Sequence, residues 1–66
     1  MRVKVNGTER EAPDGANVAT LLESLGIDPM TVVVQRNDDV VSREAFARTA
    51  VQADDQLEIV RLVGGG

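Results

Sequence analysis

The chain of 66 residues contains no cysteine and no histidine. Without cysteine it cannot form a disulfide framework, an iron–sulfur cluster, a thiolate zinc site or a nucleophilic thiol, and a reducing cytoplasm is the simplest compartment for it. Without histidine it lacks the usual general base near neutral pH, the commonest metal ligand and any Ser–His–Asp arrangement. We therefore expect a cytoplasmic protein without a metal site.

Basic residues and long apolar runs are also scarce. Seven Lys and Arg residues stand against eleven Asp and Glu residues, so the formal net charge is −4. Nucleic acids and anionic membranes demand clustered basic side chains, so we expect neither as a partner, and the partners should present basic surface. No apolar run approaches the roughly 20 residues of a membrane span, and residues 1–5 contain no signal-peptide core.

Aromatic residues are almost absent, because Phe46 is the only one. A chain this short buries only roughly 60% of its unfolded surface, so nearly every aliphatic residue must enter a single core. Valine, whose branched side chain favours strands, is the most frequent aliphatic residue. These features predict one small domain, over residues 1–63, with little material left to line a deep pocket.

The first half of the chain predicts a hairpin followed by a helix. Val3 and Val5 alternate with polar residues, and Asn6-Gly7 is a strong hairpin turn signal, so residues 8–12 should return beside the first strand. One helix face then follows at the spacing i, i+3, i+4, i+7, made of Val18, Leu21, Leu22 and Leu25. Asn17 is placed to cap the start of this helix and Gly26 to end it.

The second half predicts short strands and one irregular helical turn. Three successive valines at 32–34 make the run of residues 31–35 apolar on both faces, which is typical of a strand covered on both faces or continuing under a loop. After a turn at 37–39, a short strand at Val40-Val41 and a helical turn that lowers Phe46 onto the core should follow. A last strand is expected over residues 56–63.

This order of elements favours an α+β fold, the β-grasp, in which a mixed sheet of four to five strands carries one main helix across one face. The last strand of that arrangement lies between the earlier ones.

Several charged residues could serve either chemistry or structure. The pairs Asp38-Asp39 and Asp54-Asp55 could supply carboxylates for acid–base or metal chemistry, but both fall in expected turns, where aspartate is favoured for hydrogen bonds to the backbone. Scattered arginines could bind an anion, although they more often lie on solvated faces or form salt bridges. These are Arg36, Arg43 and Arg61.

Three glycines end the chain, and they are its most informative feature. Gly64, Gly65 and Gly66 follow directly on the last expected strand, and we expect them to form a flexible tail. Such a tail could be merely a flexible end or a cloning remnant. It could also thread a narrow channel, because it has no side chains, and deliver the carboxylate of Gly66 across about 10 Å to an enzyme.

The last strand should present different residues on its two faces. Leu57 and Ile59 share one face and should be core, whereas Val60 and Leu62 point the other way. If the strand is not covered on both sides, Val60 and Leu62 form an apolar pair just before the tail, and we expect this pair to dock partners.

The whole chain resembles the ThiS family of sulfur carriers in thiamine biosynthesis, which is ubiquitin-like in fold and ends in paired glycines. The motifs that carry the resemblance are Val3-Lys4-Val5-Asn6-Gly7, the Val18, Leu21 and Leu22 helix, the valine-rich strand, Arg36-Asn37, Val40-Val41-Ser42-Arg43-Glu44 and the ending Glu58-Ile59-Val60-Arg61-Leu62-Val63-Gly64-Gly65-Gly66. One position departs from the pattern, since Ser42 stands where several members have proline.

The resemblance implies that the protein is a substrate rather than an enzyme. An adenylating enzyme would use ATP to place AMP on the Gly66 carboxylate, and a persulfide, supplied by a donor such as a cysteine desulfurase, would replace AMP to give a thiocarboxylate. Thiazole synthase would take this sulfur into the thiazole ring of thiamine. The carrier itself would bind no cofactor and would be monomeric when free.

Three alternatives stay open at this point. The chain could be a sulfur carrier like the small subunit of molybdopterin synthase. It could instead be a ubiquitin-like modifier conjugated through Gly66, or an interaction module with inert glycines.

Overall fold

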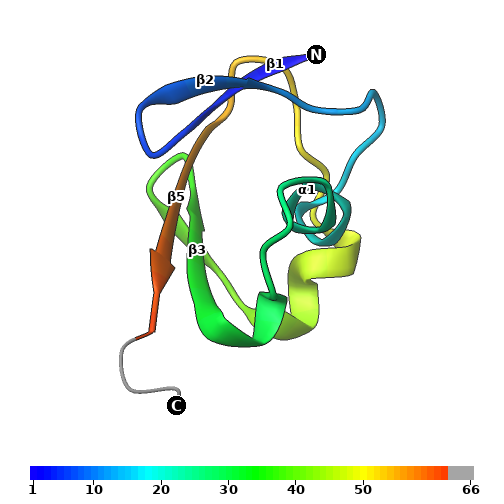
Figure 1. Ribbon diagram of the computed structural model, residues 1–66. Coiled ribbons are helices and arrows are strands. Elements are labelled where there is room, and N and C mark those ends of the chain that lie inside the picture. The colour runs from blue at the N-terminus through cyan, green and yellow to red at the C-terminus, as the bar shows by residue number, and fades with distance from the viewer. Residues whose placement is uncertain (63–66) are drawn as a thin grey trace.

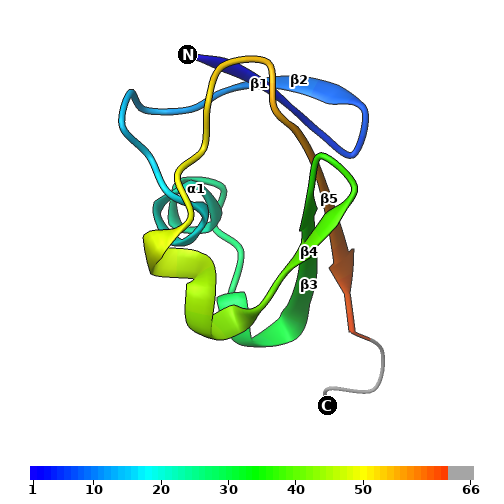
Figure 2. The same ribbon diagram turned by 180° about the vertical axis from the view of Figure 1, so that it is seen from behind.

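A computed structural model describes residues 1–62 of the chain (Figures 1 and 2). It contains a mixed five-stranded sheet in the order β2-β1-β5-β3-β4 and one α-helix, with two short 3-10 helices. The elements are β1 (Arg2–Val5), β2 (Thr8–Glu11), α1 (Val18–Ser24), η1 (Pro29–Thr31), β3 (Val32–Arg36), β4 (Asp39–Val41), η2 (Arg43–Arg48) and β5 (Gln56–Arg61). The expected β-grasp architecture is confirmed.

The first hairpin forms because its turn residues tolerate left-handed backbone. β1 and β2 pair antiparallel from Arg2 opposite Glu11 to Val5 opposite Thr8. Asn6 has φ 51° and Gly7 has φ 82°, and positive φ at both central positions is what a type I′ turn requires. The expected hairpin turn at these residues is confirmed.

The helix α1 has the two ends that the sequence indicates. The Thr20 N–H donates to Asn17 Oδ1 at 2.8 Å, and the Asn17 N–H donates to Thr20 Oγ1 at 2.9 Å, which completes a reciprocal capping box. Gly26 follows the helix with φ 71°. The apolar stripe is buried against the sheet through Val18, Leu21 and Leu22.

The strand β3 is covered on one face only. Val32 and Val34 are buried, whereas Val33 between them is exposed. The expectation of cover on both sides is therefore wrong. The physical reason is that α1 and η2 both lie on the same side of the sheet, as Figures 1 and 2 show, so the described residues provide no layer for the opposite side. The helical turn that precedes β5 does bury Phe46, as expected.

The strand β5 occupies the centre of the sheet. It is parallel to β1, with Val5 opposite Leu57, and antiparallel to β3 over five register pairs. The strand ends at Arg61 rather than at residue 63, but one further bond continues the pairing, because the Leu62 N–H donates to the Thr31 carbonyl at 2.8 Å. In Figure 1 the end of β5 lies at the opposite end of the molecule from the N-terminus.

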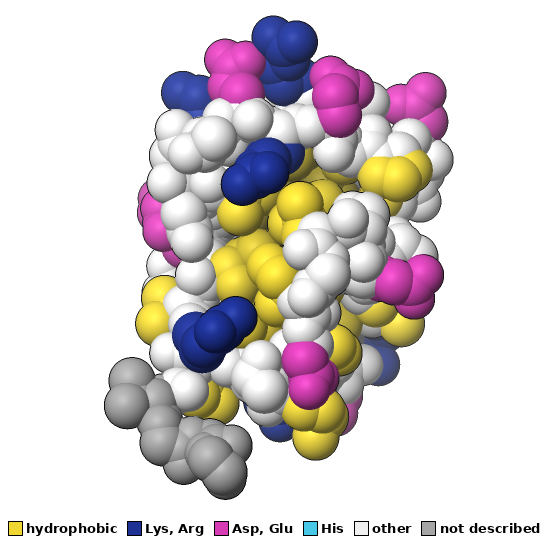
Figure 3. Space-filling model, viewed as in Figure 1, with side chains coloured by type: hydrophobic (Ala, Val, Ile, Leu, Met, Phe, Trp, Pro, Cys, Tyr) yellow, Lys and Arg dark blue, Asp and Glu magenta, His cyan; other side chains and the backbone are white. Residues whose placement is uncertain are grey.

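The core lies between the inner face of the sheet and the layer formed by α1 and η2. Figure 3 shows hydrophobic side chains gathered between the sheet and α1, with charged side chains around them. The buried residues of this core come from both layers and from the segments that connect them, and they are Val3, Val5, Ala12, Val18, Leu21, Leu22, Val32, Val34, Phe46, Val51, Leu57 and Ile59. Within residues 1–62, no helix is long and apolar enough to cross a membrane.

Candidate functional site

The three glycines of the expected tail lie outside the described residues. Gly64, Gly65 and Gly66, and with them the division of the chain into residues 1–63 and 64–66, therefore stay predictions. What the structure shows is the strand that leads to them and the surface around its end.

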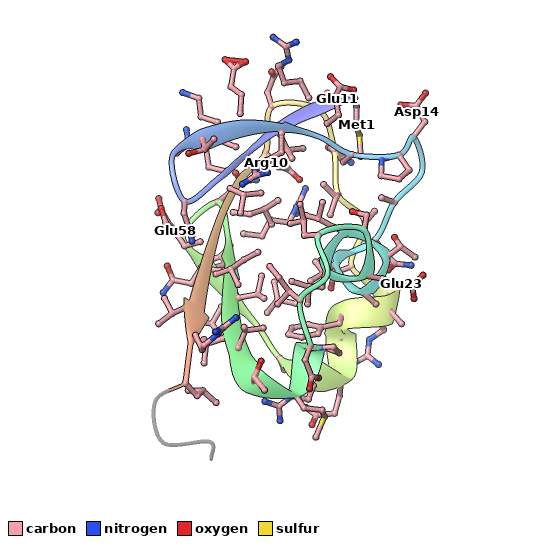
Figure 4. All side chains as sticks on the ribbon, in the orientation of Figure 1. Met1, Arg10, Glu11, Asp14, Glu23 and Glu58 are labelled. Carbon is pink, nitrogen blue, oxygen red and sulfur yellow. The ribbon has the colours of Figure 1, made fainter. Side chains whose placement is uncertain are left out.

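The side chains of β5 alternate as the sequence indicates. Leu57 and Ile59 are buried in the core, whereas the side of the sheet away from α1 carries Val60, which is 59% exposed. Leu62, one residue past the strand, is 46% exposed. Figure 4 shows Glu58 of the same strand on the side of the sheet away from α1. The proposed docking residues are thus accessible, while docking itself stays a prediction.

Two further valines extend the apolar surface beyond β5. Val33 of β3 is the register partner of Val60, and Val40 of β4 is the partner of Gln35, two residues along the same face of β3. Both valines are exposed. We call Val33, Val40, Val60 and Leu62 the outer apolar strip.

Sequence reasoning missed Val33 and Val40 because three successive valines at 32–34 do not tell which face of the strand is covered. The signal that could have found them is the expected fold itself, in which the main helix crosses one face of the sheet and leaves the other face open.

The other half of the outer face is charged. Arg2 of β1 forms ion pairs across the hairpin with Glu9 at 3.0 Å and with Glu11 at 3.7 Å. All three side chains are largely exposed, and such surface pairs contribute little to stability. The outer face therefore changes from polar at the β1–β2 hairpin to apolar near the end of β5, so the apolar part lies at the last described residues of the chain.

The acidic pair at residues 54–55 has a structural role. Asp54 adopts φ 68° in the turn, and Asp55 is the one buried charged residue in the described part of the chain, with 6% exposure. The Asp55 carboxylate accepts hydrogen bonds from Arg36 Nε at 2.6 Å, the Gln52 N–H at 2.8 Å and Asn37 Nδ2 at 3.0 Å. Burial by itself raises the pKa of Asp55, but these donors outweigh it and lower the pKa below its ordinary value.

The arginines do not come together as an anion site. Arg36 is paired with Asp55, and Arg43 donates to the backbone carbonyls of Pro29 and Met30, which ties η2 to η1. Arg61 is the last residue of β5. Within residues 1–62, no group of three or more carboxylate side chains is placed to hold a metal ion. The arrangement thus offers an exposed apolar strip that reaches Leu62, the last residue that the structure describes.

Fold and face together define a class of protein, the small β-grasp protein with one sheet face covered by a helix and the other exposed beside its last strand. Comparison with known proteins defines the family within this class. The family model described as "ThiS family" matches residues 3–66, so the chain belongs to the ThiS family. The resemblance noted in the sequence is confirmed.

Individual relatives agree with this assignment. The sulfur carrier protein ThiS of Bacillus subtilis is 29% identical over 65 residues, which is 97% of this chain and 98% of that protein. A thiazole synthase of Magnetococcus marinus and one of Paramagnetospirillum magneticum are each 41% identical over all 66 residues. The chain spans only about one fifth of the length of these two enzymes, 20% in each case.

The fold is matched by a solved structure over its whole length. The crystal structure of a thiamine biosynthesis protein (ThiS) from Geobacter metallireducens superposes with a TM-score of 0.86 at 35% identity, with 100% of both chains covered.

Proposed function

We propose that this protein is a sulfur carrier of thiamine biosynthesis that carries sulfur as a thiocarboxylate on Gly66. The observation that supports this most strongly is the ThiS family match, which runs through residue 66 and so includes the terminal glycines. The Bacillus subtilis relative, which this chain matches over nearly its full length, is named a sulfur carrier protein. The chain acts as a substrate and carrier, and the catalytic groups belong to its partners.

The chemistry begins with a carboxylate, which is a poor electrophile. An oxygen of the Gly66 carboxylate attacks the α-phosphorus of ATP held by an adenylating partner, and pyrophosphate leaves. The terminal sulfur of a persulfide then attacks the acyl carbon, and AMP leaves with the electron pair of the broken carbon–oxygen bond. A second thiol cleaves the sulfur–sulfur bond, which frees the thiocarboxylate and leaves a disulfide on the donor. Because this chain has no cysteine, no side-chain thiol of its own competes for the sulfur.

The partners follow from these steps. An adenylating enzyme supplies ATP chemistry, and a cysteine desulfurase or a similar enzyme supplies the persulfide. A thiazole synthase accepts the sulfur. The two thiazole synthases that contain a segment similar to this entire chain support the last of these, because in them a carrier-like segment and the synthase belong to one polypeptide.

The outer apolar strip is the surface on which these partners bind the carrier. It is exposed, it draws on three strands and the residue after β5, and its member Leu62 comes shortly before the terminal glycines in the sequence. Docking on this strip would bring the Gly66 carboxylate within reach of an active site without requiring tight binding of the glycines themselves.

Intact mass of the carrier after reaction tests the proposal. The chain is incubated with a ThiS-adenylating enzyme, ATP, a cysteine desulfurase and cysteine, and a variant lacking Gly66 serves as the control. We expect the mass increase of one oxygen replaced by sulfur, located on the peptide that ends at Gly66, and no change in the control. A ladder of conjugates would instead indicate a protein modifier, and an unchanged mass would overturn the proposal.

A further inference from the structure

The strand that leads to the glycines lacks a main-chain partner along part of one side. β1 pairs with β5 at only two register positions, Lys4 with Gln56 and Val5 with Leu57, because the hairpin turn at Asn6 carries the chain away. β5 continues to Arg61, and β3 pairs with its other side throughout. Past Leu57, the side of β5 that faces β1 would have an open hydrogen-bonding edge.

The side chain of Asn6 fills part of this gap. Its Nδ2 donates to the Ile59 carbonyl at 3.0 Å, and its Oδ1 accepts from the Ile59 N–H at 2.7 Å. The Asn6 backbone N–H also donates to the Leu57 carbonyl at 2.8 Å. A carboxamide offers the same donor and acceptor as a peptide group, so the side chain of Asn6 extends the β1–β5 ladder to Ile59 where the main chain has turned away.

A second asparagine holds the other end of the same strand. Asn37, in the β3–β4 turn, has the same φ of 51° as Asn6. Its Oδ1 accepts from the Gln56 N–H at 2.9 Å, and its Nδ2 donates to Asp55 at 3.0 Å. β5 is thus held by one asparagine at its start and by another near its end, and only Asn6 acts beside Val60.

We propose that Asn6 is a positioning residue for sulfur transfer, a role that rests on the proposed carrier function and deepens it. Its two hydrogen bonds lock Ile59, the residue immediately before Val60. They thereby fix the direction in which β5 presents the outer apolar strip and the chain end to a partner. Without Asn6, residues 59–62 keep only their pairing with the β3 side, and the backbone freedom gained on the β1 side must be given up on docking.

The matched variants Asn6→Gly and Asn37→Gly test this role. Both positions have φ 51°, which glycine adopts readily, so each change removes the side-chain hydrogen bonds without straining the turn. Each full-length variant is assayed by ATP–pyrophosphate exchange with the adenylating enzyme, over a range of carrier concentrations. Backbone amide hydrogen exchange is followed in parallel.

We expect Asn6→Gly to raise the KM for the carrier about tenfold, because docking must then order about one more backbone residue. The kcat should stay within about twofold of the native value. Exchange at the Ile59 amide should accelerate more than exchange at Val34. Asn37→Gly should leave KM within about twofold, even though it also disturbs the buried Asp55. That combination cannot arise from lower global stability alone.

Equal values of KM in the two variants, or an unchanged KM in Asn6→Gly, would overturn the positioning role while leaving carrier function intact. A native chain that supports no pyrophosphate exchange would overturn the carrier function and this role with it. If Asn6→Gly does not fold, Asn6→Asp keeps the acceptor for the Ile59 N–H and loses the donor to its carbonyl. In that case a native KM for Asn6→Asp would overturn the role.

Discussion

Replacing Asp55 by asparagine should destabilise the domain strongly, although the change removes only one charge and adds almost no volume. Asp55 accepts three hydrogen bonds, from Arg36, Asn37 and the Gln52 backbone. An asparagine side chain has one oxygen, so its NH₂ group must face at least one of these donors. Arg36 also loses its carboxylate partner. In this ion pair the Arg36 side chain is 27% exposed and the Asp55 side chain is 7% exposed.

The size of the effect follows from these contacts. Hydrogen bonds to a charged group are each worth about 1.5–3 kcal/mol, and part of the loss is recovered because Arg36 can rehydrate, so we expect Asp55→Asn to cost about 2–3 kcal/mol. The native stability of a domain this small is only roughly 3–10 kcal/mol, so the loss is a large share of it. At about 4–8 °C per kcal/mol, the melting temperature should fall by about 10–20 °C.

Thermal unfolding followed by circular dichroism measures this loss, with urea unfolding as a second measure. Asp54→Asn is the matched control, because it removes the same charge one residue earlier, at an exposed turn position with φ 68° where asparagine is well tolerated. The control should lie within about 0.5 kcal/mol of the native chain. If Asp55→Asn unfolds at the same temperature as Asp54→Asn, the cluster around Asp55 does not stabilise the domain as argued.

Three further outcomes are expected. Folding lowers the pKa of Asp55, so the stability that its carboxylate contributes is complete above the unfolded pKa of 3.8 and is lost as the pH falls through the lower folded pKa. Acid unfolding curves should show this loss of stability in the native chain but not in Asp55→Asn. Val60→Asp should weaken binding to the adenylating enzyme at least tenfold, as measured by calorimetry, and should keep the melting temperature within a few degrees of the native value. The neighbouring change Ile59→Asp should unfold the domain, because Ile59 is buried. A large stability loss in Val60→Asp would show that Val60 is core. Removal of Gly66 should abolish ATP–pyrophosphate exchange without altering the circular dichroism spectrum, and unchanged exchange would mean that the carboxylate of Gly66 is not the reacting group.

Much of the fold could be predicted from the sequence because its signals are local. The turn at Asn6-Gly7 needs positive φ at two adjacent residues, and the helix is bounded by Asn17 and Gly26 within its own segment. The alternation of buried and exposed side chains on β5 likewise follows from the two-residue period of a strand, and it correctly predicted that Ile59 is buried and Val60 is exposed.

Only the tertiary structure decided the features that depend on distant segments. The open face of β3 is set by where α1 and η2 pack, so the exposure of Val33 could not be predicted from a run of valines. The bond between Asn6 and Ile59 joins residues 53 positions apart, and the contact of Arg36 with Asp55 spans 19. A turn residue shows its own backbone preference in the sequence, but the partner of its side chain is determined only when the sheet assembles, because that partner is brought near by strand order rather than by spacing along the chain.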